Sequence, residues 1–108
     1  MRFAVLTHDW PQPHFDLLLE DGDECKTYRL LGDPATADPA GDRLPAEPLP
    51  RHRTHYLTYE GPVSGGRGSV ARWDAGTYRQ DEDALIFEGT RLRGRYAIRG
   101  GVFGPAAE

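Results

Sequence analysis

The sequence predicts an all-β fold: a small closed or partly closed β-barrel of about six to eight strands with long loops. Short apolar runs rich in β-branched and aromatic residues alternate with turn signals along the chain. Thirteen glycines and nine prolines in 108 residues are too many for a helix bundle. No apolar period of 3.6 residues persists for three turns, which also disfavours helices. A chain of this length supports one domain.

The expected strands follow one another along the chain, most of them with short breaks. They span residues 3–7, 15–20, 25–31, 55–59, 69–73, 77–79, 85–88 and 92–98. Asp21-Gly22 predicts a hairpin turn after the second strand, and Asp74-Ala75-Gly76 predicts a later turn. Five prolines between residues 32 and 50 predict a long irregular loop. We expect one domain over residues 1–100 and a frayed C-terminal tail over 101–108.

Composition and charge exclude several classes of protein. The single cysteine, Cys25, rules out an internal disulfide framework and a multi-cysteine zinc site. Apolar runs such as Phe3 to Leu6 are far too short to span a membrane, and the start lacks the apolar region of a signal peptide, so we expect a cytoplasmic protein. The net charge of −4 disfavours indiscriminate coating of nucleic acid but allows a local basic groove.

Two histidines and an aspartate near the N-terminus could share a metal ion. If residues 14–20 are extended, His14 and Asp16 point to one side of the strand, and the alternate apolar side chains point to the core. His8 closes the preceding strand, and a proline-held loop can return the chain near it. Two imidazoles and a carboxylate form a facial site that suits Mn, Fe, Co or Zn better than Mg or Ca. Ordinary surface histidines, or a His–Asp hydrogen bond that only orients a ring, are the alternatives.

A second group of polar residues precedes the strand expected at 55–59. His52 and Tyr56 are four residues apart, and Arg51 and Arg53 flank the histidine. A histidine near a phosphate-like substrate can act as a general acid, and a tyrosine can stabilise an anionic oxygen. The arginines favour an anion nearby. The alternative interpretation is a solvated basic turn that leads into a strand.

Motifs spread over most of the chain occur in the order typical of one known family. They are Met1-Arg2-Phe3, Thr7-His8-Asp9, His14 to Glu20, His52-x-x-x-Tyr56, Tyr59-Glu60-Gly61, Gly68-x-Val70-x-x-Trp73-Asp74-x-Gly76-Thr77-Tyr78 and Leu92-Arg93-Gly94-Arg95-Tyr96. Through these motifs, roughly residues 1 to 98 resemble the 3′-phosphoesterase domain of bacterial DNA ligase D, the multidomain repair ligase of non-homologous end joining. The resemblance implies a small β-barrel.

The resemblance also implies a site and a reaction. In that family a divalent metal, typically manganese, is held by two histidines and an aspartate that match His8, His14 and Asp16, with zinc or cobalt as alternatives here. Residues that match His52 and Tyr56 contact the scissile phosphate. The reaction removes 3′-phosphates and 3′-terminal ribonucleotides and leaves a 3′-hydroxyl for a polymerase or ligase. A divalent metal suits this chemistry because it lowers the pKa of water and neutralises charge on phosphoryl oxygens.

The chain departs from the family pattern at phosphate-binding positions. Leu18 stands where family members usually have an arginine, and it would make the pocket more apolar on the face of the metal-binding residues. The family lysine after the third strand has no clear match. Arg43 matches a further family arginine after a one-residue shift. Arg29, Arg51 or Arg53 could compensate from another position, so we expect activity to depend on whether one of them reaches the phosphate.

Three functions are compatible with these sequence features. The preferred one is a metal-dependent phosphoesterase that processes 3′ ends of DNA in repair. Its expected partners are DNA 3′ ends, with or without a terminal ribonucleotide, and a separate ligase or polymerase acting in trans, with no membrane. The second is a non-catalytic, metal-dependent module that binds nucleic-acid ends. The third is a β-barrel interaction module without activity.

Overall fold

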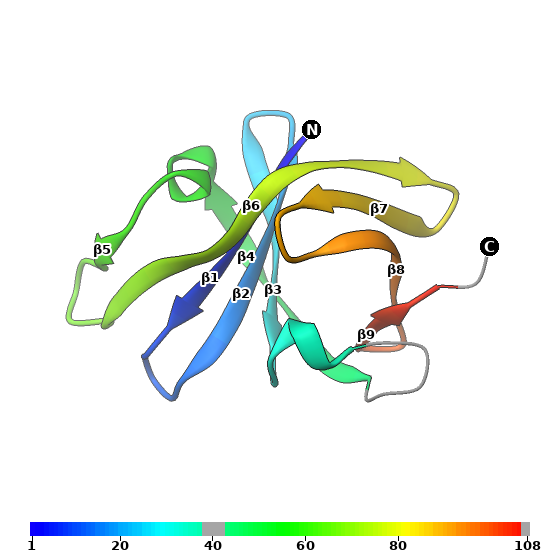
Figure 1. Ribbon diagram of the computed structural model, residues 1–108. Coiled ribbons are helices and arrows are strands. Elements are labelled where there is room, and N and C mark those ends of the chain that lie inside the picture. Colours follow the sequence, from blue (N-terminus) through cyan, green and yellow to red (C-terminus); the bar gives the residue numbers. More distant parts are fainter. Residues whose placement is uncertain (38–42, 107–108) are drawn as a thin grey trace.

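Nine strands and two short 3₁₀ helices make up the computed structural model, which describes residues 1–37 and 43–106 (Figure 1). The strands are β1 (Arg2–His8), β2 (His14–Asp21), β3 (Glu24–Leu30), β4 (Leu44–Arg53), β5 (Gly61–Pro62), β6 (Ser69–Asp81), β7 (Ala84–Gly89), β8 (Arg93–Arg99) and β9 (Val102–Pro105), and the helices are η1 (Pro34–Thr36) and η2 (Thr54–Leu57). Neither of these described helices is long and apolar enough to cross a membrane.

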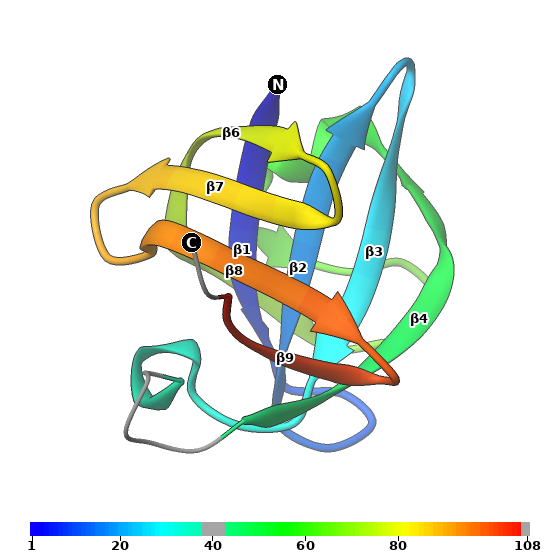
Figure 2. The same cartoon turned by 90° about the vertical axis from the view of Figure 1, so that its right-hand side faces the viewer.

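Antiparallel pairing closes eight of these strands into a barrel. Neighbours follow the order β1-β2-β3-β4-β9-β8-β7-β6, and β6 returns to pair with β1. Figure 2 shows β6, β7 and β8 in front of β1, β2 and β3, with β9 and β4 joining the two layers. The short strand β5 pairs with the N-terminal end of β6, at Ser69 and Val70, whereas β7 pairs with its C-terminal half. The predicted small closed β-barrel with long loops is confirmed.

Strands β1 and β2 bury side chains on both of their faces. One face fills the barrel, where Phe3, Leu17 and Leu19 join a core to which the other barrel strands contribute Leu30, Ala46, Tyr78, Phe87 and Phe103 among others. The opposite face carries a second apolar cluster, which consists of Ala4, Leu6, Leu18, Cys25, Leu57 and Val70. Strict alternation along β2 therefore assigns odd positions to the barrel and even positions to its outside.

Helix η2 is attached to the outside of the barrel by this second cluster. The expected strand over residues 55–59 is wrong, because residues 54–57 form the 3₁₀ helix η2. Its Leu57 side chain is 3% exposed and packs with Leu18, which is fully buried. Apolar burial on the outer face of β1 and β2 thus holds the segment that follows β4.

Strand β4 lies where the prolines predicted a loop. It pairs with β3 along residues 46–53 but with β9 only at Leu44 and Pro45. Within the described chain, the rest of β4 is a sheet edge, and proline is tolerated there because no ladder partner needs its missing N–H. Residues 38–42 of the expected loop lie outside the described residues.

Strand β6 runs through the turn that Asp74-Ala75-Gly76 predicted. Its pairing with β1 shifts by one residue, since Val5 faces Asp74 and Leu6 faces Arg72. This β-bulge takes up Trp73 and bends the strand without ending it, so the two short strands expected here are one. A Cβ at Gly76 would collide with the backbone of β7, which explains the glycine inside the strand.

Part of the segment expected as a frayed tail over 101–108 is instead a strand. Residues Val102–Pro105 form β9 between β8 and β4, and Phe103 is fully buried in the barrel core. Burial of this phenyl ring stabilises the segment by roughly 2 kcal/mol and adds to the stabilisation from its pairing with β8 and β4. Residues 107–108 lie outside the described residues.

Asp74 fixes the connection between β7 and β8. Its carboxylate is 4% exposed and accepts backbone hydrogen bonds from Ala75, Thr90, Arg91 and Leu92 at 2.7–3.0 Å. A charged acceptor satisfies these donors better than a neutral one would, because charge-assisted hydrogen bonds are roughly twice as strong. One buried side chain therefore organises a turn far from it in sequence.

We expect Asp74→Ala to lower the free energy of unfolding by about 3 kcal/mol, because it leaves backbone N–H groups without an acceptor. Chemical denaturation followed by circular dichroism measures this. The matched control is Asp83→Ala, which removes an exposed ion pair with Arg99 and should cost less than about 1 kcal/mol. Equal losses in the two variants would contradict the role assigned to Asp74.

Candidate metal centre and phosphate pocket

His8, His14 and Asp16 converge at the end of the β1–β2 hairpin. His8 ends β1, His14 begins β2, and the two are directly paired across the strands with ring centroids 4.9 Å apart. Asp16 lies two residues further along β2 and therefore shares the face of His14. One ligand atom from each residue lies within 4.8 Å of the other two. The structure thus brings together the three residues that the sequence selected.

The Asp16 carboxylate lies between the two imidazoles. Its Oδ2 is 2.9 Å from His8 Nδ1, and its Oδ1 is 2.9 Å from His14 Nε2. His14 and Asp16 are 7% and 3% exposed, so water competes little for these atoms. Each imidazole also donates from its other ring nitrogen to a backbone carbonyl at 2.8 Å, His8 to Arg67 and His14 to Gln12.

These outer hydrogen bonds decide which nitrogens can bind a metal. A neutral imidazole has one N–H, and in both rings the backbone carbonyl takes it. In the neutral rings, His8 Nδ1 and His14 Nε2 then point their lone pairs at the carboxylate oxygens of Asp16. A cation bound between these atoms would remove the repulsion between the lone pairs and the negative charge. A backbone acceptor behind each histidine is also the usual support of a metal-binding imidazole. The donor set of two nitrogens and a carboxylate oxygen fits a first-row divalent ion.

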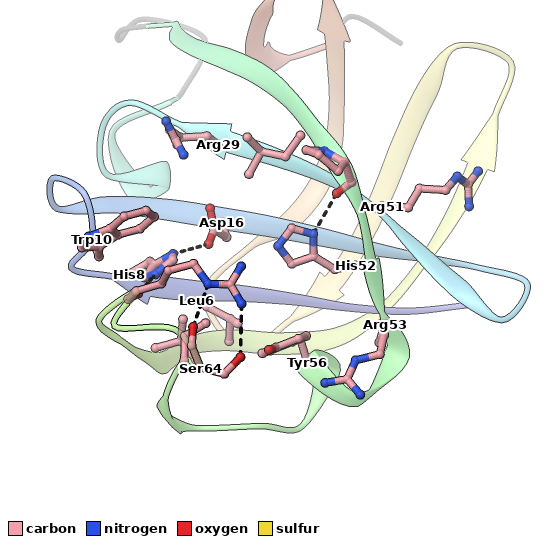
Figure 3. A pocket seen from close by; sticks show the side chains of 15 residues that line it. Leu6, His8, Trp10, Asp16, Arg29, Arg51, His52, Arg53, Tyr56 and Ser64 are labelled. Carbon is pink, nitrogen blue, oxygen red and sulfur yellow. Dashed lines mark hydrogen bonds and ion pairs between the residues drawn. The ribbon is translucent and has the colours of Figure 1, made fainter.

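A pocket of about 430 Å³ opens beside this cluster on the outside of the barrel (Figure 3). Its floor is formed by β1 and β2, and its walls are formed by β3, β4, η2 and the glycine-rich segment before β6. Its lining residues are Leu6, His8, Trp10, Asp16, Arg29, Leu49, Pro50, Arg51, His52, Arg53, Tyr56, Val63, Ser64, Arg67 and Val70. Four arginines and one carboxylate line it, so the pocket suits an anion.

His52 and Tyr56 form the wall across from the metal cluster. His52 Nδ1 donates to the carbonyl of Pro50 at 2.8 Å, which fixes the ring and leaves Nε2 as the nitrogen available to a ligand. Figure 3 shows the His52 imidazole projecting from β4 into the space that His8 and Asp16 also border. The Tyr56 ring packs edge-on against it, with centroids 5.8 Å apart. Both residues predicted to contact a phosphate therefore lie in this pocket.

The arginines that line the pocket differ in how they are held. Arg51 pairs with Asp21 at 2.6 Å, which lowers the pKa of that carboxyl, and Figure 3 shows its side chain pointing away from the metal cluster. Arg67 donates twice to Ser64, at 2.7 and 3.2 Å. The Arg53 guanidinium lies 5.8 Å from the centroid of the Tyr56 ring.

In the part of the chain that the structure describes, Arg29 is held only by a long ion pair and lies next to the metal cluster. It is the cross-strand neighbour of Asp16, and it forms an ion pair with Glu47 at 3.8 Å. Its Nε is buried and has no hydrogen-bond partner among the described residues. A buried guanidinium nitrogen without an acceptor is costly, so Arg29 is held with one of its donors unsatisfied.

Two residues expected at the pocket do not line it. Arg43 does not reach it: its guanidinium donates to the carbonyl of Pro105 at 3.1 Å, beside β9. This position lies at the opposite end of the ten-residue strand β4 from His52, up to about 30 Å along the chain. Leu18 shares the face of His14 and Asp16 but does not line the pocket, because it is fully buried under η2.

Arg67 and Trp10 are site residues that the sequence reasoning missed. The backbone of Arg67 holds His8, and Trp10 forms part of the pocket wall. The available signal for Trp10 was its place two residues after His8. Arg67 and His8 are 59 positions apart in the sequence, and no local pattern predicts their contact.

Residues 6–99 match the DNA ligase D 3′-phosphoesterase domain family. Because the match covers most of the 108 residues, the chain belongs to this family. No curated protein matched the chain. Family membership supports a phosphoesterase-type function in DNA end processing and implies interaction with DNA ends.

We expect the chain to bind one Mn²⁺ ion per molecule, measured by isothermal titration calorimetry after treatment with a chelator. His14→Ala should weaken this binding by at least tenfold, because it removes one of three donors. His55→Ala is the matched control, since His55 is an exposed histidine outside the cluster. Undiminished binding by His14→Ala would place the ion elsewhere.

Proposed function

We propose that this protein is a metal-dependent phosphoesterase that removes 3′-phosphates and 3′-terminal ribonucleotides from DNA ends. The observation that carries the proposal is one shared pocket: His8 and Asp16 of the His8–His14–Asp16 cluster, together with His52, Tyr56 and several arginines, border it. A phosphate monoester needs these groups together, because its hydrolysis requires charge neutralisation, a nucleophile and a proton for the leaving oxygen. Family membership supports the same reaction class.

His8, His14 and Asp16 would hold the divalent ion, with manganese as the first candidate and zinc or cobalt as alternatives. When bound, such an ion lowers the pKa of water and neutralises negative charge on phosphoryl oxygens. The protein contributes rigidity, since all three residues belong to one antiparallel hairpin and both imidazoles are oriented by backbone carbonyls. A fixed donor set keeps the reacting phosphate in one place.

His52 and Tyr56 act on the phosphate from the opposite wall. As the doubly protonated imidazolium, His52 donates the Nε2 proton to the departing 3′-oxygen, while its Nδ1–H stays bonded to the Pro50 carbonyl, and the neutral ring is left behind. The Tyr56 hydroxyl donates a hydrogen bond to a non-bridging oxygen. Both roles need the ester to lie between this wall and the metal cluster, which the extent of the pocket allows.

Arg29 supplies the phosphate contact that the sequence lacks at Leu18. Among the pocket arginines, it alone neighbours Asp16 on the adjacent strand. Its contact with the half-exposed Glu47 is long enough to be exchanged for a phosphate oxygen at little cost. Arg51, by contrast, would first have to leave a 2.6 Å bond to Asp21.

Leu18 stands in place of the family arginine, and this substitution also favours the second function, a module that binds DNA ends without turnover. If Arg29 does not replace the family arginine, the site retains the donor set for a metal and an anion but lacks a charge near the reacting group. A 3′-phosphorylated oligonucleotide would then bind in a metal-dependent manner and remain unchanged.

We expect the wild-type chain with Mn²⁺ to convert a 3′-phosphate oligonucleotide to its 3′-hydroxyl form, followed by gel electrophoresis. His52→Ala should lower kcat/KM by roughly 10²- to 10⁴-fold, because the leaving oxygen loses its proton donor. With p-nitrophenyl phosphate, whose leaving group needs no proton, the loss should be much smaller. Equal losses with both substrates would contradict a general-acid role, and bound but unconverted DNA would favour the non-catalytic module.

Arg29→Ala should weaken binding of a 3′-phosphorylated oligonucleotide by about tenfold to a hundredfold relative to its 3′-hydroxyl form, because one charged phosphate contact is lost. Fluorescence anisotropy of both oligonucleotides measures the ratio. Arg51→Ala is the matched control and should preserve the ratio. If the phosphate preference survives in Arg29→Ala and disappears in Arg51→Ala, the assignment is reversed.

A further inference from the structure

Trp10 is an exposed aromatic residue at the rim of the phosphate pocket. Its side chain is 43% exposed, and it lines the pocket together with His8 and Asp16. The described chain places neither an aromatic ring nor a guanidinium against it. Trp73 is the contrast, because it packs edge-on against Phe15 and lies under the guanidinium of Arg91. The exposed indole of Trp10 is therefore not explained by packing.

The backbone that carries Trp10 is firmly attached to the barrel. Asp9 Oδ1 accepts from the Ser69 N–H at 2.8 Å, and the Asp9 N–H donates to the Ser69 carbonyl at 3.4 Å. Gly68 lies so close to this loop that a Cβ there would collide with the Asp9 carboxylate and with Trp10 Cβ. The backbone at Trp10 is thus fixed at the rim of the pocket, which lowers the entropy lost when a ligand stacks on its ring.

We propose that Trp10 stacks on the nucleobase of the 3′-terminal nucleotide. This inference rests on the proposed function, which places the terminal phosphate at the metal cluster. Trp10 is two residues from His8, so their Cα atoms lie within about 7 Å, and a terminal base is only one sugar away from its 3′-phosphate. Figure 3 shows Trp10 on the side of His8 that lies away from Tyr56. The preferred substrate is then a nucleic-acid end that carries a terminal base.

Stacking of this kind is not specific for one base, because every nucleobase presents a π face to the indole. Its contribution is instead a preference for a terminus that has a base over one that has none. From the usual strength of base–aromatic stacking, this preference should be roughly fivefold to a hundredfold in affinity. The phosphate contacts themselves are the same in both ligands.

The test compares two 3′-phosphorylated oligonucleotides that differ only in whether the terminal sugar carries a base or is abasic. For the wild-type chain, we expect affinity and kcat/KM to favour the base by about tenfold. Trp10→Ala should reduce this ratio to near one, and Trp10→Phe should retain most of it. Leu31→Ala, which removes another exposed apolar side chain outside the pocket, is the matched control and should keep the wild-type ratio.

A second readout does not depend on turnover. Trp73→Phe leaves Trp10 as the only tryptophan, and with Zn²⁺ bound its fluorescence should be quenched by the base-bearing end and not by the abasic end. Phosphate release with the same ratio in wild type and Trp10→Ala overturns the stacking and leaves the phosphoesterase intact. Absence of both release and metal-dependent binding in the wild-type chain overturns the proposed function itself.

Discussion

The register of the β1–β2 hairpin is the constraint on which the site and the core both depend. It sets His8 opposite His14 and carries Asp16 to the same face, while Leu17 and Leu19 fill the barrel. A slip of one residue would turn Leu17 and Leu19 to the outer face and Asp16 into the barrel core. The apolar free energy that selects this register therefore also selects the ligand geometry. Because both faces of β2 are buried, few alternative pairings compete with it.

The second half of the pocket comes from a segment about forty residues further along the chain. Pairing of β4 with β3 places His52, and Leu57 anchors η2, which carries Tyr56, against Leu18 on the outer face of the barrel. Both residues then lie opposite the metal cluster. Elsewhere, surface carboxylates are paired with arginines; Arg2, for example, lowers the pKa of Glu20 to about 2. The pocket instead has more arginines than carboxylates, so a chain with a net charge of −4 still offers an anion a positive site.

Strand periodicity predicted an all-β fold and placed His14 and Asp16 on one face, because it decides which side chains share a face. The family resemblance then selected His8, His14 and Asp16 together. Contacts between distant segments were not predictable in this way. The prolines of β4 predicted a loop, because the sequence does not show that most of this strand lies at a sheet edge, where proline is tolerated. Arg43 was misplaced for the same reason, since pairing with β9 determines where it lies. The buried Nε of Arg29 likewise becomes visible only once β3 is paired with β2.

Pulsed electron paramagnetic resonance of the Mn²⁺-loaded chain tests the central claim most directly. The geometry of His8, His14 and Asp16 predicts hyperfine coupling to two imidazole nitrogens in the wild-type protein and to one in His14→Ala. A bound ion without nitrogen coupling, or coupling that is unchanged in His14→Ala, would show that these residues do not hold the metal. The pocket would then have no metal beside it, and the hydrolytic function built on it would fail.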